Sequence, residues 1–196
     1  MVKESDASIT HMANGSKEYF LRLQSGISNI RHDEIAVLAQ QIEQTCAAGG
    51  NIWIAGYGGS AATASHMAVD LSFGVRPGGK IRAISLSDSV SSVTATGNDV
   101  SFEEIFSRQL KGLARSGDLL ILISASGNSP NLFRAFDEAS SMGVKTAAIL
   151  GFDGGLLASK VHYPVLAECQ IGDYGVAEDL HLAINHCLKE LLNYGE

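Results

Sequence analysis

Short apolar segments alternate with helix-like segments along most of this chain, and this alternation restricts the fold more than any other feature. The apolar segments have the length of β-strands and span Asn51–Ala55, Lys80–Leu86, Leu119–Ser124, Lys145–Leu150 and Tyr163–Ala167. Helical patterns lie between and after them, over Ala61–Phe73, Ser101–Leu113, Asn131–Met142 and Val176–Asn193. The inner segments are nearly continuous in Ile, Leu, Val and Ala, which is typical of parallel strands covered on both faces. The sequence therefore predicts an α/β fold with one doubly wound, mostly parallel five-stranded sheet.

Two further helix-like segments precede the first predicted strand. They span Lys17–Ile30 and His32–Ala48, and a pair of glycines ends the second. Residues 1–16 are polar, and we expect them to form a flexible N-terminus. No linker or change of composition divides the rest of the chain, so residues 17–196 are predicted to form a single domain.

The composition excludes several classes of function. The net charge is −7 and no long basic run is present, which argues against sequence-independent binding of nucleic acid. No segment approaches the roughly 20 apolar residues of a membrane span, and the N-terminus lacks the apolar core of a signal peptide. The three cysteines are widely spaced and form no C-x-x-C pair, so we expect reduced thiols. These features predict a soluble, cytoplasmic protein.

Two of the predicted strands end in turns that are rich in small and hydroxylated residues. Gly58, Gly59 and Ser60 follow the first strand, and the second turn contains Ser124, Ser126, Asn128 and Ser129. Backbone N–H groups and hydroxyls that converge at a helix N-terminus form a cradle for an anion. A tight turn alone explains the first cradle equally well. The second has more hydroxyl and amide groups than a turn needs, so the pair predicts a phosphorylated metabolite.

Two stretches carry side chains suited to acid–base chemistry or metal binding. His66 and Asp70 stand four residues apart, on one face of a predicted helix, although a surface histidine beside a carboxylate has the same spacing. Glu178 and His186 lie eight residues apart in the last predicted helix, about 12 Å along its axis. They are too far apart to bind one ion from the same straight helix. Either Glu178 reaches in from a bend or different subunits contribute the two residues, and we favour the shared interfacial site, which predicts an obligate oligomer.

Asn98 and Asp99 form a third candidate, in the stretch T-A-T-G-N-D. Their amide and carboxylate oxygens are good acceptors for sugar hydroxyls. An Asx turn introduced by Gly97 explains the same residues equally well. The sequence leaves these two interpretations open.

Taken together, these residues resemble the SIS, or sugar isomerase, domain family and, within it, the phosphoheptose isomerases. The resemblance covers nearly the whole chain. It rests on G-Y-G-G-S with H-x-x-x-D, G-N-D with I-F-S-R, S-x-S-G-N-S, and E-x-x-H-x-x-x-x-H. It implies a homotetramer with active sites at subunit interfaces and a bound zinc ion.

The resemblance also implies an activity and a role for each candidate residue. The activity is aldose–ketose isomerisation of sedoheptulose 7-phosphate and D-glycero-D-manno-heptose 7-phosphate through an enediol, which supplies heptose for lipopolysaccharide biosynthesis. Phosphate contacts fall on Ser124, Ser126 and Ser129, and substrate contacts fall on Gly58, Gly59, Asn98 and Asp99. The metal and acid–base cluster comprises His66, Asp70, Glu178 and His186, with Asp70 as the base and His186 as the acid.

Three positions depart from the usual pattern of these isomerases. Tyr57 stands where Asn is usual, Asp70 where Glu is usual, and Glu178 where Gln is usual. Because Asp is one methylene shorter than Glu, the change can withdraw the base from its proton and cost about a hundredfold in rate. Glu178 adds a negative charge that suits a cation. The two changes can compensate for each other, or they mark a branch that acts on another sugar phosphate.

Two other functions fit the same resemblance. Some SIS proteins are non-catalytic modules that sense a sugar phosphate or bind a protein partner, and other SIS isomerases act on arabinose 5-phosphate or a hexose 6-phosphate. A binding module needs only the fold and the phosphate cradle. All four acid–base or ligand positions of this chain carry side chains that can ionise or bind a metal, which favours an enzyme.

Overall fold

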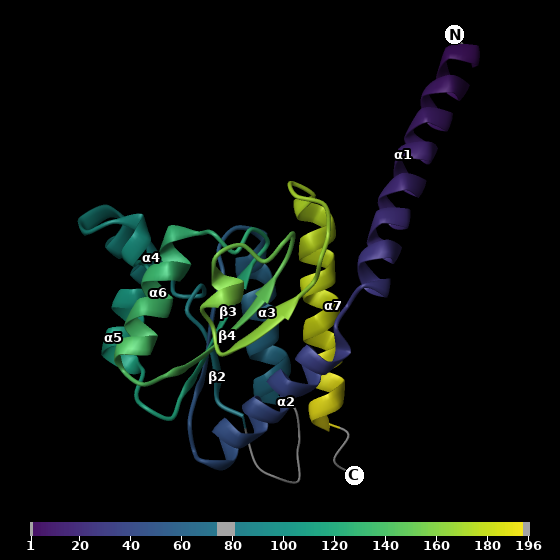
Figure 1. The fold of residues 1–196 in the computed structure, drawn as a ribbon. Coiled ribbons are helices and arrows are strands. Elements are labelled where there is room, and N and C mark those ends of the chain that lie inside the picture. The colour runs from purple at the N-terminus through teal and green to yellow at the C-terminus, as the bar shows by residue number, and fades with distance from the viewer. Residues whose placement is uncertain (1, 74–80, 194–196) are drawn as a thin grey trace.

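The computed structural model describes residues 2–73 and 81–193, and its centre is a parallel β-sheet (Figure 1). The strands are β1 Ile52–Ala55, β2 Ala83–Ser85, β3 Leu119–Ser124, β4 Lys145–Leu150 and β5 Tyr163–Leu166. They lie in the order β2-β1-β3-β4-β5, and every neighbouring pair is parallel. The prediction of an α/β fold with a five-stranded, mostly parallel sheet is therefore confirmed. Lys80, which the second predicted strand included, lies outside the described residues.

Helices cover both faces of this sheet. They are α1 Val2–Ser28, α2 His32–Ala47, α3 Gly59–Phe73, α4 Val90–Asp99, α5 Ser107–Leu113, α6 Pro130–Ser141 and α7 Tyr174–Asn193, with short 3₁₀ turns at Phe102–Glu104 and Leu157–Ser159. Alternate residues of the central strand point to opposite faces. Ile121 packs with the apolar sides of α2, α3 and α7, whereas Leu122 packs with those of α5 and α6. This layering places α3 and α7 together on one face.

The N-terminal helix is longer than predicted. The expected start at Lys17 is wrong, because α1 begins at Val2 and runs through the polar segment 2–16 (Figure 1). Its last part packs on α7, where Tyr19 Oη donates to Asp179, and Arg22 pairs with Asp173 directly before that helix. The division into a flexible segment 1–16 and one domain over 17–196 stays a prediction. No helix in the described ranges is long and apolar enough to cross a membrane.

The stretch between β2 and β3 differs from the prediction in two ways. The single helix expected over 101–113 is wrong, because this stretch is divided into a 3₁₀ turn and α5, and α4 was not predicted. Most residues of α4 are β-branched or Ser, Gly, Asn and Asp, which are weak helix formers. Ser89 caps it, since its Oγ accepts a hydrogen bond from the backbone N–H of Ser92. Asn98 and Asp99 are therefore the last residues of a helix and do not form an Asx turn.

One of the buried residues of α7 is a histidine, His181. His181 has no solvent exposure, and neither ring nitrogen has a partner of hydrogen-bonding geometry within the described residues. Burial lowers the pKa of His181 to about 4, and the backbone of Leu150 only partly offsets this effect. The folded protein therefore keeps this side chain neutral at a pH where an unfolded chain protonates it.

This histidine makes the protein less stable in acid. Between pH 6.5 and about 4 the unfolded chain binds a proton that folded His181 does not, so stability is lost as the pH falls through this window. His181→Leu should remove that loss. Its free energy of unfolding, relative to the wild type, should rise by about 2 kcal/mol between pH 7.5 and 5.0 in urea titrations at equal protein concentration. The exposed His11→Gln serves as the control, and a pH-independent difference for His181→Leu would contradict the prediction.

Candidate active site

Two strand-to-helix turns lie side by side at the carboxyl edge of the sheet. One joins β1 to α3 and the other joins β3 to α6, and β1 pairs with β3. The strand order 2-1-3-4-5 reverses between these two strands, and ligands of doubly wound sheets bind at such a switch point. Gly58 has a φ of 63°, a left-handed conformation that favours glycine. At Gly59 a Cβ would overlap the carboxylate of Glu178, so a larger residue there requires that side chain to move.

The two turns enclose a cavity of about 160 Å³. Most of its lining residues are ones that the sequence predicted for the two cradles. They are Gly58, Gly59 and Ser60 from the first turn and Ser124, Ser126 and Ser129 from the second. The wall is completed by Tyr57, Ile123, Ala125, Tyr174 and Glu178. The structure therefore brings both predicted cradles to one polar cavity at the start of α3 and α6.

The side chain of Asn128 holds the second turn together. Its Nδ2 donates to the carbonyl of Ser126, and its Oδ1 accepts from the backbone N–H of Leu156. Within the same turn, Ser124 Oγ accepts from the N–H of Gly127. Asn128 does not line the cavity. Its amide is engaged with the backbone, and the role of Asn128 in binding the substrate stays a prediction.

Asn98 and Asp99 lie apart from this cavity. Asn98 donates to Asp99, and Asp99 lines a separate hollow of about 380 Å³ together with Arg108 and Gln109. That hollow lies between α4 and α5, on the face of the sheet opposite α3 and α7. A single chain therefore does not bring these two residues to the cradles.

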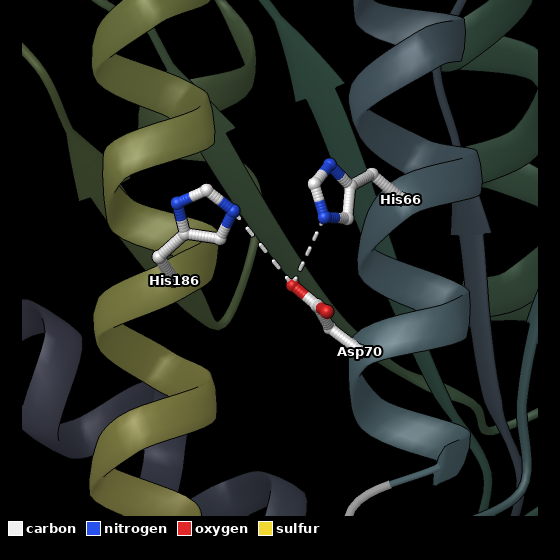
Figure 2. Close-up of side chains that lie close together, drawn as sticks. All are labelled: His66, Asp70 and His186. Atoms are coloured by element: carbon white, nitrogen blue, oxygen red, sulfur yellow. Dashed lines mark ion pairs between the residues drawn. The ribbon is translucent and has the colours of Figure 1, made fainter.

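A second cluster forms where α3 faces α7. His66 and Asp70 project from α3 and His186 projects from α7, and Figure 2 shows both imidazoles directed toward the carboxylate. Asp70 Oδ2 lies 3.4 Å from Nε2 of His66 and 3.9 Å from Nε2 of His186. The side chains of the two histidines are about half exposed, at 45% and 51%, while that of Asp70 is 8% exposed. The cluster thus combines a buried carboxylate with two imidazoles that solvent or a ligand can reach.

Two residues that the sequence analysis did not single out also hold Asp70. Asn185 Nδ2 donates to Oδ2 of Asp70 at 2.9 Å, and Lys189 Nζ lies 3.2 Å from Oδ1. Both come from α7. A polar Asn directly after Ile184 and three residues before Leu188, on the apolar side of the predicted helix, was the available signal for the first of them.

Glu178 is not part of this cluster. It lies at the start of α7, where its carboxylate meets Gly59, and His186 follows two turns further along the same helix. Three of the four predicted metal ligands come together, because ligand atoms of His66, Asp70 and His186 lie within 4.8 Å of one another. The described part of one chain therefore forms a three-residue set, with Glu178 at the cavity instead.

Fold and site together define an α/β domain of the sugar-isomerase type, with a polar cavity at the switch point and a His/Asp cluster beyond it. Residues 17–151 match the family model described as the SIS domain, and the chain belongs to this family. Curated relatives include the phosphoheptose isomerase of Chlorobaculum parvum, 38% identical over 177 residues, covering 89% of this chain and 84% of the relative. That of Trichlorobacter lovleyi is 40% identical over 164 residues and covers 82% of each chain.

Solved structures give the same result. The phosphoheptose isomerase GmhA from Neisseria gonorrhoeae superposes with a TM-score of 0.83 at 28% identity, covering 94% of this chain and 98% of that one. The match extends over the N-terminal helices and the last helix as well as the sheet, because almost the whole of both chains is covered.

Proposed function

We propose that the protein is a phosphoheptose isomerase that interconverts sedoheptulose 7-phosphate and D-glycero-D-manno-heptose 7-phosphate. Relatives of that name match most of its length. The observation that carries the proposal is the His66–Asp70–His186 cluster, which lies further along the same helix whose start forms the polar cavity. A sugar phosphate with its phosphate in the cavity can then reach acid–base side chains with its other end.

The cavity suits a phosphate monoester. It lies at the N-termini of α3 and α6, where helix dipoles and free backbone N–H groups favour an anion. Ser124, Ser126 and Ser129 supply hydroxyl donors for its oxygens. We therefore assign phosphate binding to these serines together with the backbone of Gly58, Gly59 and Ser60. Asn98 and Asp99 fit this assignment only if another subunit supplies them.

The separation of the two parts suits a long sugar. Gly59 meets Glu178 near the start of each helix, and Asp70 meets Asn185 further along, so α3 and α7 run in the same direction. The rise from Glu178, which lines the cavity, to His186 is about 12 Å at 1.5 Å per residue. An extended seven-carbon chain with a terminal phosphate has a similar length of about 10 Å, given C–C bonds of about 1.5 Å. The phosphate and the reacting carbons can thus be bound at once.

The cluster contains the groups that the isomerisation requires. We assign Asp70 Oδ2 as the base that takes the proton from C1 of the ketose while His186 Nε2 gives a proton to the C2 oxygen, which yields the enediol. His186 then takes the proton of the C1 hydroxyl, and Asp70 returns its proton to C2. The products are the aldehyde at C1 and the hydroxyl at C2, with both side chains back in their starting states.

The same three side chains fit a zinc ion. Two imidazole nitrogens and one carboxylate oxygen form the donor set of many catalytic zinc sites, which keep a fourth position open. We propose that His66, Asp70 and His186 would hold the ion. Nε2 of His186 would then carry no proton, so in the metal-bound site the ion would act on the C2 oxygen in place of this imidazole. Glu178 is left out because it lies at the cavity. Bound zinc would polarise the sugar carbonyl as a Lewis acid.

The exposed side of α1 supports the expectation of a homotetramer. The helix projects away from the rest of the chain (Figure 1). Its exposed apolar side chains are Ile9, Met12, Phe20, Leu21 and Ile27, each at least half exposed. An apolar stripe on a projecting helix buries itself against another copy of the chain. We propose a cytoplasmic homotetramer in which neighbouring subunits complete each active site.

Phe20→Glu should disrupt this assembly. It places a charge in the centre of the apolar stripe, where burial against a partner would be costly. Light scattering after gel filtration should show a species smaller than that of the wild type. Glu18→Gln, two residues away and therefore on the other side of the helix, should leave the mass unchanged. An unaltered mass for Phe20→Glu would exclude this stripe as the interface.

The activity can be tested directly by NMR. Zinc-loaded protein is incubated with sedoheptulose 7-phosphate, and new anomeric signals of the aldose are expected. They should disappear with His186→Ala and after chelation, but persist with His11→Ala, which changes an exposed histidine of α1. Absence of turnover with retained sugar-phosphate binding would reject the heptose assignment and favour a sensor, whereas turnover of arabinose 5-phosphate instead would change the substrate.

A further inference from the structure

We propose that Asn185 and Lys189 are positioning residues that hold the carboxylate of Asp70 in its working orientation. This inference rests on the proposed function, because Asp70 is the base of the proposed reaction and the two residues orient it. Both residues lie on α7, one turn apart, and thus on the side of the helix that faces α3.

The two contacts use different oxygens of Asp70. Asn185 donates to Oδ2, the oxygen that also faces both histidines, while Lys189 lies against Oδ1. A carboxylate held at both oxygens cannot rotate about its Cβ–Cγ bond without losing one of the contacts. Oδ2 is therefore fixed toward His66 and His186.

Asn185 is an unfavourable residue for its position unless this contact matters. It is completely buried between Ile184 and Leu188, which belong to the apolar core. Its Oδ1 has no hydrogen-bond partner among the described residues, and an orphaned buried acceptor typically costs about 1–3 kcal/mol. A Leu would fill the same space without this cost. The amide is therefore explained by the one bond that it makes, to Asp70.

The contacts also account for the short side chain of the base. Aspartate reaches one methylene less far from α3 than glutamate would. Donors on α7 draw the Asp70 carboxylate across to the histidine of that helix, so the cluster can close with the shorter residue. Groups that orient a metal ligand or a base from behind typically contribute about 10–100-fold to metal affinity or activity.

The test compares Asn185→Leu, Asn185→Gln and Lys189→Met with the wild type. Asn185→Leu should lower kcat and zinc affinity by about 10–100-fold each, with KM changed less than about threefold. Its melting temperature should change little, because the orphaned acceptor is removed together with the hydrogen bond to the buried Asp70 carboxylate. Asn185→Gln keeps the amide donor and should recover part of the loss. Lys111→Met, on α5 across the sheet, is the control for Lys189→Met.

A readout independent of turnover and of zinc separates this inference from the proposed function. In the metal-free protein, Asn185→Leu should shift the imidazole NMR resonances of His66 and His186 and leave those of His11 and His32 in place. If the wild type fails to isomerise any sugar phosphate, the proposed function is rejected. The His66 and His186 resonances still decide whether Asn185 positions Asp70. Unchanged His66 and His186 signals would overturn the positioning role, whatever the activity.

Discussion

Replacing Asp70 with Asn is expected to lower kcat for isomerisation by about a thousandfold, because acid–base groups typically contribute about 10²–10⁴. An amide has nearly the shape of the carboxylate but cannot accept a proton from carbon. The phosphate site that we propose lies at the other end of α3, so KM should change less than about threefold. Steady-state kinetics with sedoheptulose 7-phosphate at saturating zinc measures both constants.

Zinc loading and folding must be controlled, because Asp70 is also a proposed metal ligand. Bound zinc is measured for each variant, and kcat is referred to the loaded fraction. Asp137→Asn, an exposed position of α6 on the other face of the sheet, should behave as the wild type. If Asp70→Asn retains more than about a tenth of the wild-type kcat, a different group is the base.

The sheet could be predicted because its strands carry their signal locally. The residues of β3 are all buried, and their sequence L-L-I-L-I-S contains no polar residue before the last. A strand covered on both faces must be apolar throughout, so its limits could be read from the sequence. α4 offered no such signal, since a serine cap and packing against the rest of the protein stabilise it despite weak helix formers.

The candidate site also contains features with a local sequence signal and features that depend on tertiary packing. The cradles could be predicted because each lies within one strand-to-helix turn, and parallel strands place such turns at one edge. His66 and Asp70 share a helix face by spacing alone. By contrast, the contact of His186 with Asp70 and the position of Glu178 depend on how α7 docks against α3. Asn185 and Lys189 were missed for the same reason, because their partner is more than a hundred residues away.

Gly127→Ala is expected to damage the second cradle and the fold together. Gly127 has a φ of 62°, and a Cβ there would overlap the backbone carbonyl of Gly154 in the neighbouring loop. The left-handed conformation and the backbone clash together should lower the free energy of unfolding by about 2–4 kcal/mol. The N–H of Gly127 donates to Ser124, so relief of the clash must shift the turn that carries the serines to which we assign phosphate binding.

The consequence separates loss of stability from loss of phosphate binding. At a temperature where the variant remains folded, KM for the sugar phosphate and the inhibition constant for inorganic phosphate should both rise more than about tenfold, because several charge-assisted hydrogen bonds are misplaced at once. Gly112→Ala is the matched control, since a Cβ at this α5 residue would meet no atom within 4 Å. Ala in a helix is typically more favourable than Gly by about 0.5–1 kcal/mol. A Gly127→Ala variant with wild-type phosphate affinity would show that the second turn only supports the fold, and the phosphate would then have to bind at the β1–α3 turn alone.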